Sequence, residues 1–218
     1  MIVSNKFKFI FIRVPKTGSS SITRCLRDFE ILNNGIFEYR HDSYDFVNDE
    51  ELQFFNNLRQ DNPDLTLTPN HSECAGCEKI IEPDVCKNYF KFSFVRNPWS
   101  RILSRYEWGL QLVNDMTDSS IFKSFKNYLK HINEDDFRAF VQPQYDYTIG
   151  CNYIGKCENL QEDFNIVCDK IGIPQQQLPH KNASKHKHYT EYYDDETRQI
   201  VAEKYAKDIE YFGYEFGE

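Results

Sequence analysis

The segment that most constrains this chain spans Phe9–Ile22 and reads FIFIRVPKTGSSSI. Its apolar start predicts a buried strand, its middle a short turn, and its serines the start of a helix. The first N–H groups of a helix have no intrahelical acceptor, and the helix dipole places positive charge beside them. With Lys16 in the turn, this arrangement is typical of a site for phosphate or sulfate. A helix cap next to an incidental lysine is the alternative interpretation.

The composition predicts one well-packed domain that covers residues 1–218. The chain of 218 residues shows no shift in composition that would separate two domains. Its 18 Phe and 14 Tyr can fill a compact core, so we do not expect a disordered chain. The net charge of −8 disfavours a nucleic-acid-binding protein, and an anion site must therefore be a local basic patch.

The sequence predicts neither a membrane span nor a disulfide framework. The apolar run from Phe7 to Val14 contains Lys8 and Arg13 and is shorter than the ~20 residues of a span. Seven cysteines, an odd number, fit a reducing compartment, and we expect a cytoplasmic protein. Cys74 and Cys77 have the spacing of a zinc knuckle, but no second Cys or His pair follows, so we expect idle thiols and no metal site.

A second strand-to-helix turn follows the aromatic segment Tyr89–Val95, which predicts a strand. The chain continues with Arg96 and Asn97, and Pro98 then suits the first position of a helix. Two such turns predict adjacent parallel strands in an α/β protein whose central parallel sheet is flanked by helices. Both turns would open at the carboxyl edge of the sheet, where ligands bind.

Hydrophobic periodicity and turn residues predict the other elements. We expect helices at Ser19–Phe29, Asp49–Leu58, Glu73–Ile81 (ended by Pro83), Ile121–His131, Asp135–Val141, Leu160–Ile171 (stopped by Gly172) and Asp194–Tyr211, with a strand at Tyr153–Lys156. The segment Pro174–His188 predicts a loop. Its last nine residues contain three lysines and three histidines, and a solvated basic loop is the default interpretation.

The phosphate motifs do not fit an ATP-using kinase. A nucleotide-binding loop of that class has glycines before its lysine, whereas Gly18 follows Lys16 here. The second strand ends in Arg96, where a magnesium site would require an aspartate. An arginine binds phosphate instead, and Ser104 lies two helical turns further on, where it could join Arg96 only if the phosphate lies along that helix. The two turns therefore predict two anion sites on one nucleotide.

These residues resemble the sulfotransferases that use 3′-phosphoadenosine 5′-phosphosulfate, in particular the Golgi carbohydrate sulfotransferases and their soluble bacterial relatives. Val14–Ser21 resembles the 5′-phosphosulfate loop of that family, and Phe94–Ser104 resembles its 3′-phosphate motif. The resemblance continues through Gly155–Phe164, the Asn182–Ser184 loop and the tail Tyr192–Tyr214. Lys156-Cys157 stands where arginine and phenylalanine are expected, and residues 36–70 match no family pattern, which leaves the acceptor side unspecified.

The resemblance implies a P-loop-NTPase-like sulfotransferase fold and roles for individual residues. Lys16 would stabilise the charge on the departing nucleotide, and the donor phosphates would be held by Lys16, Thr17, Gly18, Ser19, Ser20, Ser21, Arg96, Ser104, Ser184 and Lys185. A sulfuryl group would pass by in-line displacement from the donor, 3′-phosphoadenosine 5′-phosphosulfate, to an acceptor hydroxyl. Fixed protein charges can meet the demands of that transfer, so no metal is expected.

An acceptor hydroxyl requires a general base, and histidine has the side chain whose pKa lies nearest neutrality. His71 is the first candidate, because the soluble relatives carry a histidine at a similar distance before the second phosphate strand. His41 is the second candidate. A polar loop histidine without a catalytic role is the alternative interpretation of His71.

We expect a carbohydrate hydroxyl as the acceptor, with a small-molecule or tyrosine hydroxyl as the alternative. Two other functions compete with the sulfotransferase. One is a metal-dependent nucleotide kinase, which would require magnesium and ATP. The other is a nucleotide-binding module that keeps the phosphate sites without turnover.

Overall fold

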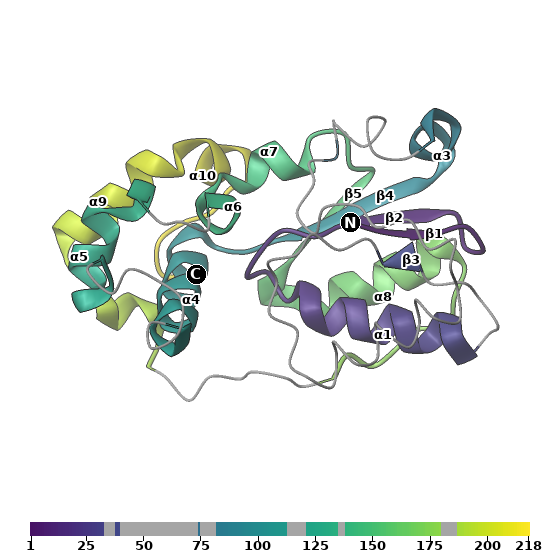
Figure 1. Cartoon of the computed structure of the whole chain (residues 1–218), viewed down its shortest axis with the longest axis horizontal. Coiled ribbons are helices and arrows are strands. Elements are labelled where there is room, and N and C mark those ends of the chain that lie inside the picture. Colours follow the sequence, from purple (N-terminus) through teal and green to yellow (C-terminus); the bar gives the residue numbers. More distant parts are fainter. Residues whose placement is uncertain (33–37, 40–73, 75–81, 113–120, 135–137, 180–186) are drawn as a thin grey trace.

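The computed structural model describes residues 1–32, 38–39, 74, 82–112, 121–134, 138–179 and 187–218 (Figure 1). The predicted helix at Asp49–Leu58 lies outside these residues, as does most of the predicted helix at Glu73–Ile81.

A mixed five-stranded sheet forms the centre of the fold. Its strand order is β3 (Glu38–Tyr39), β1 (Ile2–Ser4), β2 (Phe9–Ile12), β4 (Phe90–Val95) and β5 (Tyr153–Lys156). The predicted parallel pairing is confirmed, because β2 pairs with β4 and β4 with β5 in parallel. The sheet as a whole is mixed, because β1, a strand that the sequence did not predict, is antiparallel to both β2 and β3. A strand of three residues is too short to show a period in the sequence.

Helices cover both faces of this sheet. In Figure 1, α1 (Ser19–Leu32) and α8 (Leu160–Ile171) lie together below it, while α3 (Pro83–Asn88) and α7 (Gln144–Thr148) lie above. The lower core joins the phenylalanines of β2 and β4 to the apolar side of α8, and the rings of Phe11 and Phe92 stack with centroids 4.9 Å apart. Helix α3 was not predicted. It begins at Pro83, because proline suits the first turn of a helix as well as the end of a preceding one.

The helix α8 is joined to β5 by one carboxylate. Asp163 Oδ2 accepts a hydrogen bond from the backbone N–H of Lys156 at 2.6 Å, and its Oδ1 accepts one from the Tyr153 hydroxyl at 3.0 Å. Burial, with Asp163 as the second cause, raises the pKa of Tyr153 to about 12. The predicted helix Leu160–Ile171 is confirmed, and Gly172 ends it with a left-handed φ of 71°.

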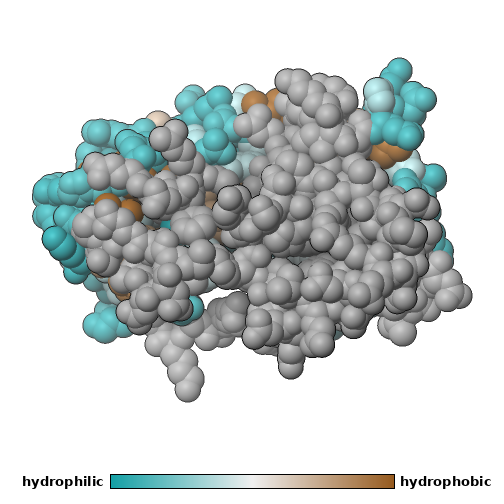
Figure 2. Space-filling model, in the orientation of Figure 1, coloured by the Kyte–Doolittle hydropathy of each residue, from teal (hydrophilic) through white to brown (hydrophobic). Residues whose placement is uncertain are grey.

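A second group of helices lies beside the sheet, at the left of Figure 1. It contains α4 (Pro98–Leu112), the 3₁₀ segments η2 (Ile121–Lys123), η3 (Ile132–Glu134) and η5 (Tyr189–Tyr192), α5 (Phe125–Lys130), α6 (Arg138–Val141), α9 (Asp195–Lys204) and α10 (Ala206–Phe212). These elements share a core that contains Trp99, Tyr128 and Tyr205. The described atoms over α5 and α9 are mostly hydrophilic on the face shown in Figure 2. Lys126 pairs there with Asp194 and Glu196.

Two predicted helices are interrupted. The helix expected at Ile121–His131 is divided by Ser124, whose hydroxyl accepts from the Asn127 N–H at 3.1 Å and caps α5. The helix expected at Asp194–Tyr211 breaks at Tyr205, which is fully buried and donates its hydroxyl proton to the Val141 carbonyl. Of the helix expected at Asp135–Val141, the described part is α6.

One described cysteine, Cys86, is disulfide-bonded. The sequence predicted no disulfide framework, and its expectation of idle thiols concerned Cys74 and Cys77. Disulfide bonds are absent from five other described cysteines, Cys25, Cys74, Cys151, Cys157 and Cys168. Across the described ranges, no helix is both long enough and apolar enough to cross a membrane.

Gly155 provides a test of the packing between β5 and its neighbours. A Cβ atom at this position would lie 2.5 Å from Cε1 of Phe94 and 3.0 Å from Cβ of Asp163. Gly155→Ala should therefore lower the free energy of unfolding by ~1–3 kcal/mol, measured by urea denaturation. Ile166→Ala on the exposed side of α8 is the control and should change it by less than ~0.5 kcal/mol. An unchanged midpoint for Gly155→Ala would contradict the close contact.

Candidate functional site

The first candidate loop connects β2 to α1 by a tight turn. Lys16 and Gly18 both have left-handed backbones, with φ of 67° and 79°. The positive φ of Gly18 favours glycine, and a Cβ atom there would also lie 2.8 Å from Cδ2 of Leu160, which would have to shift. The Gly18 carbonyl accepts from the Ser21 N–H at 3.1 Å and starts the helix. A non-glycine residue held in this conformation stores strain, and such strain is common at functional sites.

The hydroxyl side chains of this loop differ in exposure. Thr17 is fully buried, and its hydroxyl donates to the Val14 carbonyl at 2.9 Å. Ser19 is buried as well, whereas Ser21 is half-buried and Ser20 is exposed. The Thr17 side chain therefore shapes the turn from within. The hydroxyls of Ser20 and Ser21 are the more accessible ones.

The second candidate loop connects β4 to α4 and touches the first. Arg96 donates from Nε to the Ser100 hydroxyl at 3.0 Å and from Nη1 to the Lys16 carbonyl at 3.5 Å. Arg101 is fully buried and donates from Nε to the Pro15 carbonyl at 3.1 Å. Because β2 and β4 are adjacent parallel strands, their carboxyl ends bring the two loops together, as predicted.

Arg96 and Ser104 share a cavity of about 280 Å³ between α4 and the chain before α9, so the two residues predicted to act together are brought together. The cavity is lined by Arg96, Ser100, Leu103, Ser104, Glu158, Lys187, His188, Tyr189 and Glu218. Lys187 and His188 are the last residues of the predicted basic loop, so the end of that loop lines this cavity. Sequence reasoning missed Ser100, although it follows Arg96 by one helical turn on the same face.

The acidic side chain beside Arg96 has its own partners. Glu158 accepts from the Asn97 N–H at Oε1 (2.7 Å) and from the Tyr214 hydroxyl at Oε2 (3.2 Å). Each carboxylate oxygen of Glu158 therefore accepts a hydrogen bond, one from the loop backbone and one from the C-terminal segment. Burial raises the pKa of the adjacent Cys157 thiol to about 11, an effect that Arg96 opposes and Glu158 reinforces.

An aromatic ring lies beside the side chain of Lys16. Its Nζ is 5.2 Å from the ring centroid of Trp108, and the Arg105 guanidinium carbon is 5.1 Å from that ring. Trp108 itself stacks on Phe140, with centroids 4.9 Å apart. A cation over an aromatic face is attracted electrostatically. The Lys16 ammonium therefore lies on the side of its loop that faces α4. The sequence pattern did not indicate this contact between Lys16 and Trp108.

Four predicted site residues lie outside the described residues. These are the candidate bases His71 and His41 and the loop residues Ser184 and Lys185. Within the described part of the chain, no three His, Cys, Asp or Glu side chains are grouped so that they could hold a metal ion.

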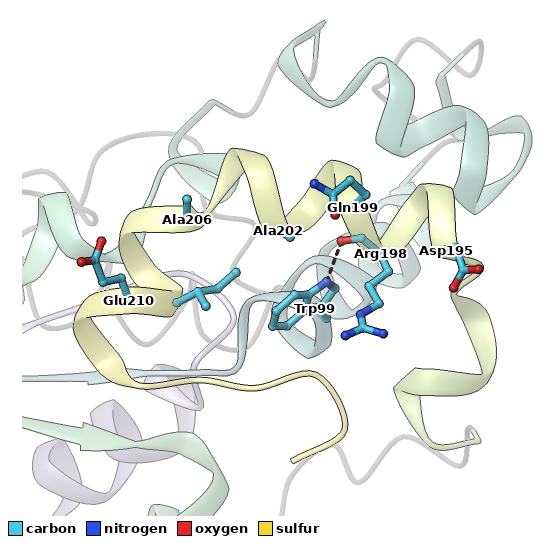
Figure 3. Close-up of a pocket in the computed structure, with 8 residues that line it drawn as sticks. Trp99, Asp195, Arg198, Gln199, Ala202, Ala206 and Glu210 are labelled. Carbon is cyan, nitrogen blue, oxygen red and sulfur yellow. Dashed lines mark hydrogen bonds between the residues drawn. The ribbon is translucent and has the colours of Figure 1, made fainter.

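A larger cavity of about 470 Å³ lies along α9 and α10 and contains none of the predicted site residues (Figure 3). Trp99, Ala202, Ala206 and Ile209 form its apolar part. The indole N–H of Trp99 donates to the Arg198 carbonyl at 3.0 Å, so the polar atom of this ring is already engaged. Of the two cavities, the smaller one is lined by the predicted site residues Arg96 and Ser104.

Comparisons with known proteins found a family model, related sequences and a solved structure that resemble this chain. The model of the Sulfotransferase family matches residues 1–215. An uncharacterized protein of Archaeoglobus fulgidus is 33% identical over 91 residues, which are 40% of this chain and 72% of that protein. Carbohydrate sulfotransferase 14 of Mus musculus is 24% identical over 200 residues, covering 80% of this chain.

The chain spans 47% of that mouse protein's length. Among solved structures, a sulfotransferase from Alicyclobacillus acidocaldarius aligns with a TM-score of 0.49 and 16% identity, over 92% of each chain. Because the family model covers nearly the whole sequence, this chain belongs to the sulfotransferase family.

Proposed function

We propose that this protein transfers a sulfuryl group from 3′-phosphoadenosine 5′-phosphosulfate to a carbohydrate hydroxyl. The observation that carries the proposal is the contact between the two loops, where Arg96 Nη1 lies 3.5 Å from the Lys16 carbonyl. Each loop leads from a parallel strand into a helix N-terminus, which favours an anion. Membership of the sulfotransferase family agrees with a donor that has anionic groups at two positions.

The donor set of the smaller cavity suits a phosphate. Arg96 offers a guanidinium, Ser100 and Ser104 offer hydroxyls, and Lys187 offers an ammonium that also pairs with Glu191 at 3.2 Å. The same lining contains the side chains of Glu158 and Glu218. Charged donors of this kind form short, strong hydrogen bonds with phosphate oxygens. We assign this cavity to the 3′-phosphate and the Lys16–Ser21 loop to the 5′-phosphosulfate. Ser184 and Lys185, which lie outside the described residues, are proposed to help hold the donor nucleotide.

The chain's own groups can meet the charge demands of the transfer. The donor supplies the sulfuryl group. Lys16 stabilises the negative charge that develops on the departing phosphate oxygen, and the first N–H groups of α1 orient the 5′-phosphate. His71 takes the proton from the acceptor hydroxyl. Because protein cations and N–H groups carry out these roles, the proposed transfer uses no metal ion.

A carbohydrate is the proposed acceptor because the mouse relative is named as a carbohydrate sulfotransferase. The test is an acceptor screen with a sulfate-labelled donor, with chelator present and ATP absent. Label transferred to a glycan supports the proposal. Transfer only to a small phenol or to a tyrosine peptide would change the acceptor class, and turnover that requires ATP and magnesium would favour a kinase. Bisphosphate binding without any transfer would favour a binding module.

Lys16→Ala should lower the rate of sulfuryl transfer by at least ~10²-fold while the folded structure remains, because the ammonium acts on charge that develops in the transition state. The measurement is the single-turnover rate, with circular dichroism to confirm folding. Lys8→Ala is a matched control, since Lys8 also has a left-handed backbone, with φ of 54°. A Lys16→Ala rate within a few-fold of the original would contradict the assigned role.

Arg96→Ala should weaken binding of adenosine 3′,5′-bisphosphate by ~1.5–3 kcal/mol, the range expected for a charge-assisted hydrogen bond. The affinity for adenosine 5′-monophosphate should barely change, because that nucleotide lacks the group that Arg96 contacts. Calorimetry measures both affinities. Arg198→Ala, an exposed arginine of the larger cavity, is the control and should alter neither. Equal losses for both nucleotides would make Arg96 structural.

His71→Ala should lower the transfer rate by ~10²–10⁴ and leave the donor's affinity unchanged, because a general base acts in the transition state. The rate of the unaltered enzyme should fall as the pH drops through the pKa of this histidine, since a protonated imidazole accepts no proton. His41→Ala is the comparison. If that variant loses the rate and His71→Ala keeps it, His41 is the base. Loss of donor binding in His71→Ala would place that residue in the nucleotide pocket.

A further inference from the structure

The backbone of Arg96 is held on both sides by one side chain, that of Gln144 at the start of α7. Gln144 Oε1 accepts from the Arg96 N–H at 2.8 Å, and Gln144 Nε2 donates to the Arg96 carbonyl at 2.8 Å. Gln144 is fully buried. An amide can satisfy an N–H and a C=O at the same time, which neither a carboxylate nor an apolar side chain can do.

We propose that Gln144 is a positioning residue that sets the preference for a 3′-phosphorylated nucleotide by fixing the backbone from which the Arg96 side chain extends. This inference rests on the proposed function, in which Arg96 binds the 3′-phosphate.

A buried carboxylate holds Gln144 in turn. Asp208 of α10 accepts at Oδ2 from the Gln144 N–H (2.8 Å) and from Nε2 (3.3 Å), and at Oδ1 from the Tyr145 N–H (2.8 Å). These acceptors satisfy N–H groups at the start of α7, which have no intrahelical partner. Asp208 is fully buried. A continuous line of hydrogen bonds thus runs from α10 through α7 to the end of β4.

The Arg96 side chain leaves this fixed backbone toward the cavity. Its Nε is directed to Ser100, and its Nη1 to the Lys16 carbonyl. A flexible arginine loses rotamer entropy when it binds a phosphate, and a fixed starting geometry reduces that cost. Without the two bonds from Gln144, the peptide groups on both sides of the Arg96 Cα could rotate. The Arg96 guanidinium would then move away from the position in which it binds the 3′-phosphate.

The test compares two nucleotides in Gln144→Met, which keeps a similar side-chain length and removes both hydrogen bonds. Its affinity for adenosine 3′,5′-bisphosphate should fall on the order of tenfold, the effect of losing about one hydrogen bond's net contribution. Its affinity for adenosine 5′-monophosphate should stay within about twofold. Calorimetry on the full chain measures both. Should Gln144→Met fail to fold, Gln144→Asn replaces it in the same measurement. Asparagine keeps a polar amide, but its side chain is too short to bridge the N–H and the C=O of Arg96.

Gln161→Met is the matched control. The amide of Gln161 also pairs with backbone in both directions, donating to the Gln176 carbonyl at 3.0 Å and accepting from the Leu178 N–H at 2.9 Å. It lies on α8, and it is not among the residues that line the Arg96 cavity. Gln161 is only half-buried, so this variant should lose less stability than Gln144→Met, and it should keep the ratio of the two nucleotide affinities.

The outcomes separate this inference from the proposed function. An unaltered protein that binds both nucleotides equally would overturn the proposed function itself. A clear preference for the bisphosphate in the unaltered protein that persists in Gln144→Met would overturn only the role of Gln144. Equal losses for both nucleotides in Gln144→Met would also overturn that role, because they would show a general structural effect. A preference lost in Gln144→Met and kept in Gln161→Met supports it.

Discussion

The parallel pairing of β2 with β4 is the constraint on which the site depends. Parallel neighbours end at the same edge of a sheet, so the loops that follow them must meet there. Their aromatic side chains pack below the sheet, and the Ser93 hydroxyl donates to the Ile12 carbonyl across the pair at 2.8 Å. If these strands slipped by one residue, side chains would change faces and the two loops would separate along the strand axis.

The strand-to-helix units were predictable because local signals encode them. An apolar run followed by a turn glycine and serines specifies β2 and α1, and a proline at the first helical position specifies α4. Helix α8 was predictable for the same reason, since its periodic apolar residues end at Gly172. That Arg96 and Ser104 line the same cavity then follows from helix geometry and requires no knowledge of distant residues.

The parts that sequence reasoning missed depend on contacts between residues far apart in the chain. Gln144 reaches Arg96 across 48 positions, and Asp208 reaches Gln144 across 64. Nothing local distinguishes this glutamine from the others nearby. Tyr205 interrupts a helix-forming segment because its hydroxyl bonds to the Val141 carbonyl and its ring enters a core, so tertiary packing overrides propensity. The base candidates lie outside the described residues, so their assignment still rests on resemblance.

Arg96, in the loop before α4, and Arg101, in α4, show how two arginines close together in the sequence can take different roles. Arg101 is fully buried and donates to the carbonyls of Pro15, Gln142 and Phe140, so its donors are committed to backbone. Arg96 is only half-buried, lines a cavity, and makes one side-chain bond to a hydroxyl and one longer bond to a carbonyl. A guanidinium has five N–H donors. Those of Arg101 stabilise the loops by bonding to backbone carbonyls, whereas Arg96 has donors left for a ligand. The bonds of Arg101 and Gln144 thus hold the backbone of the two loops, while the Arg96 side chain lines the cavity between them and the C-terminal segment.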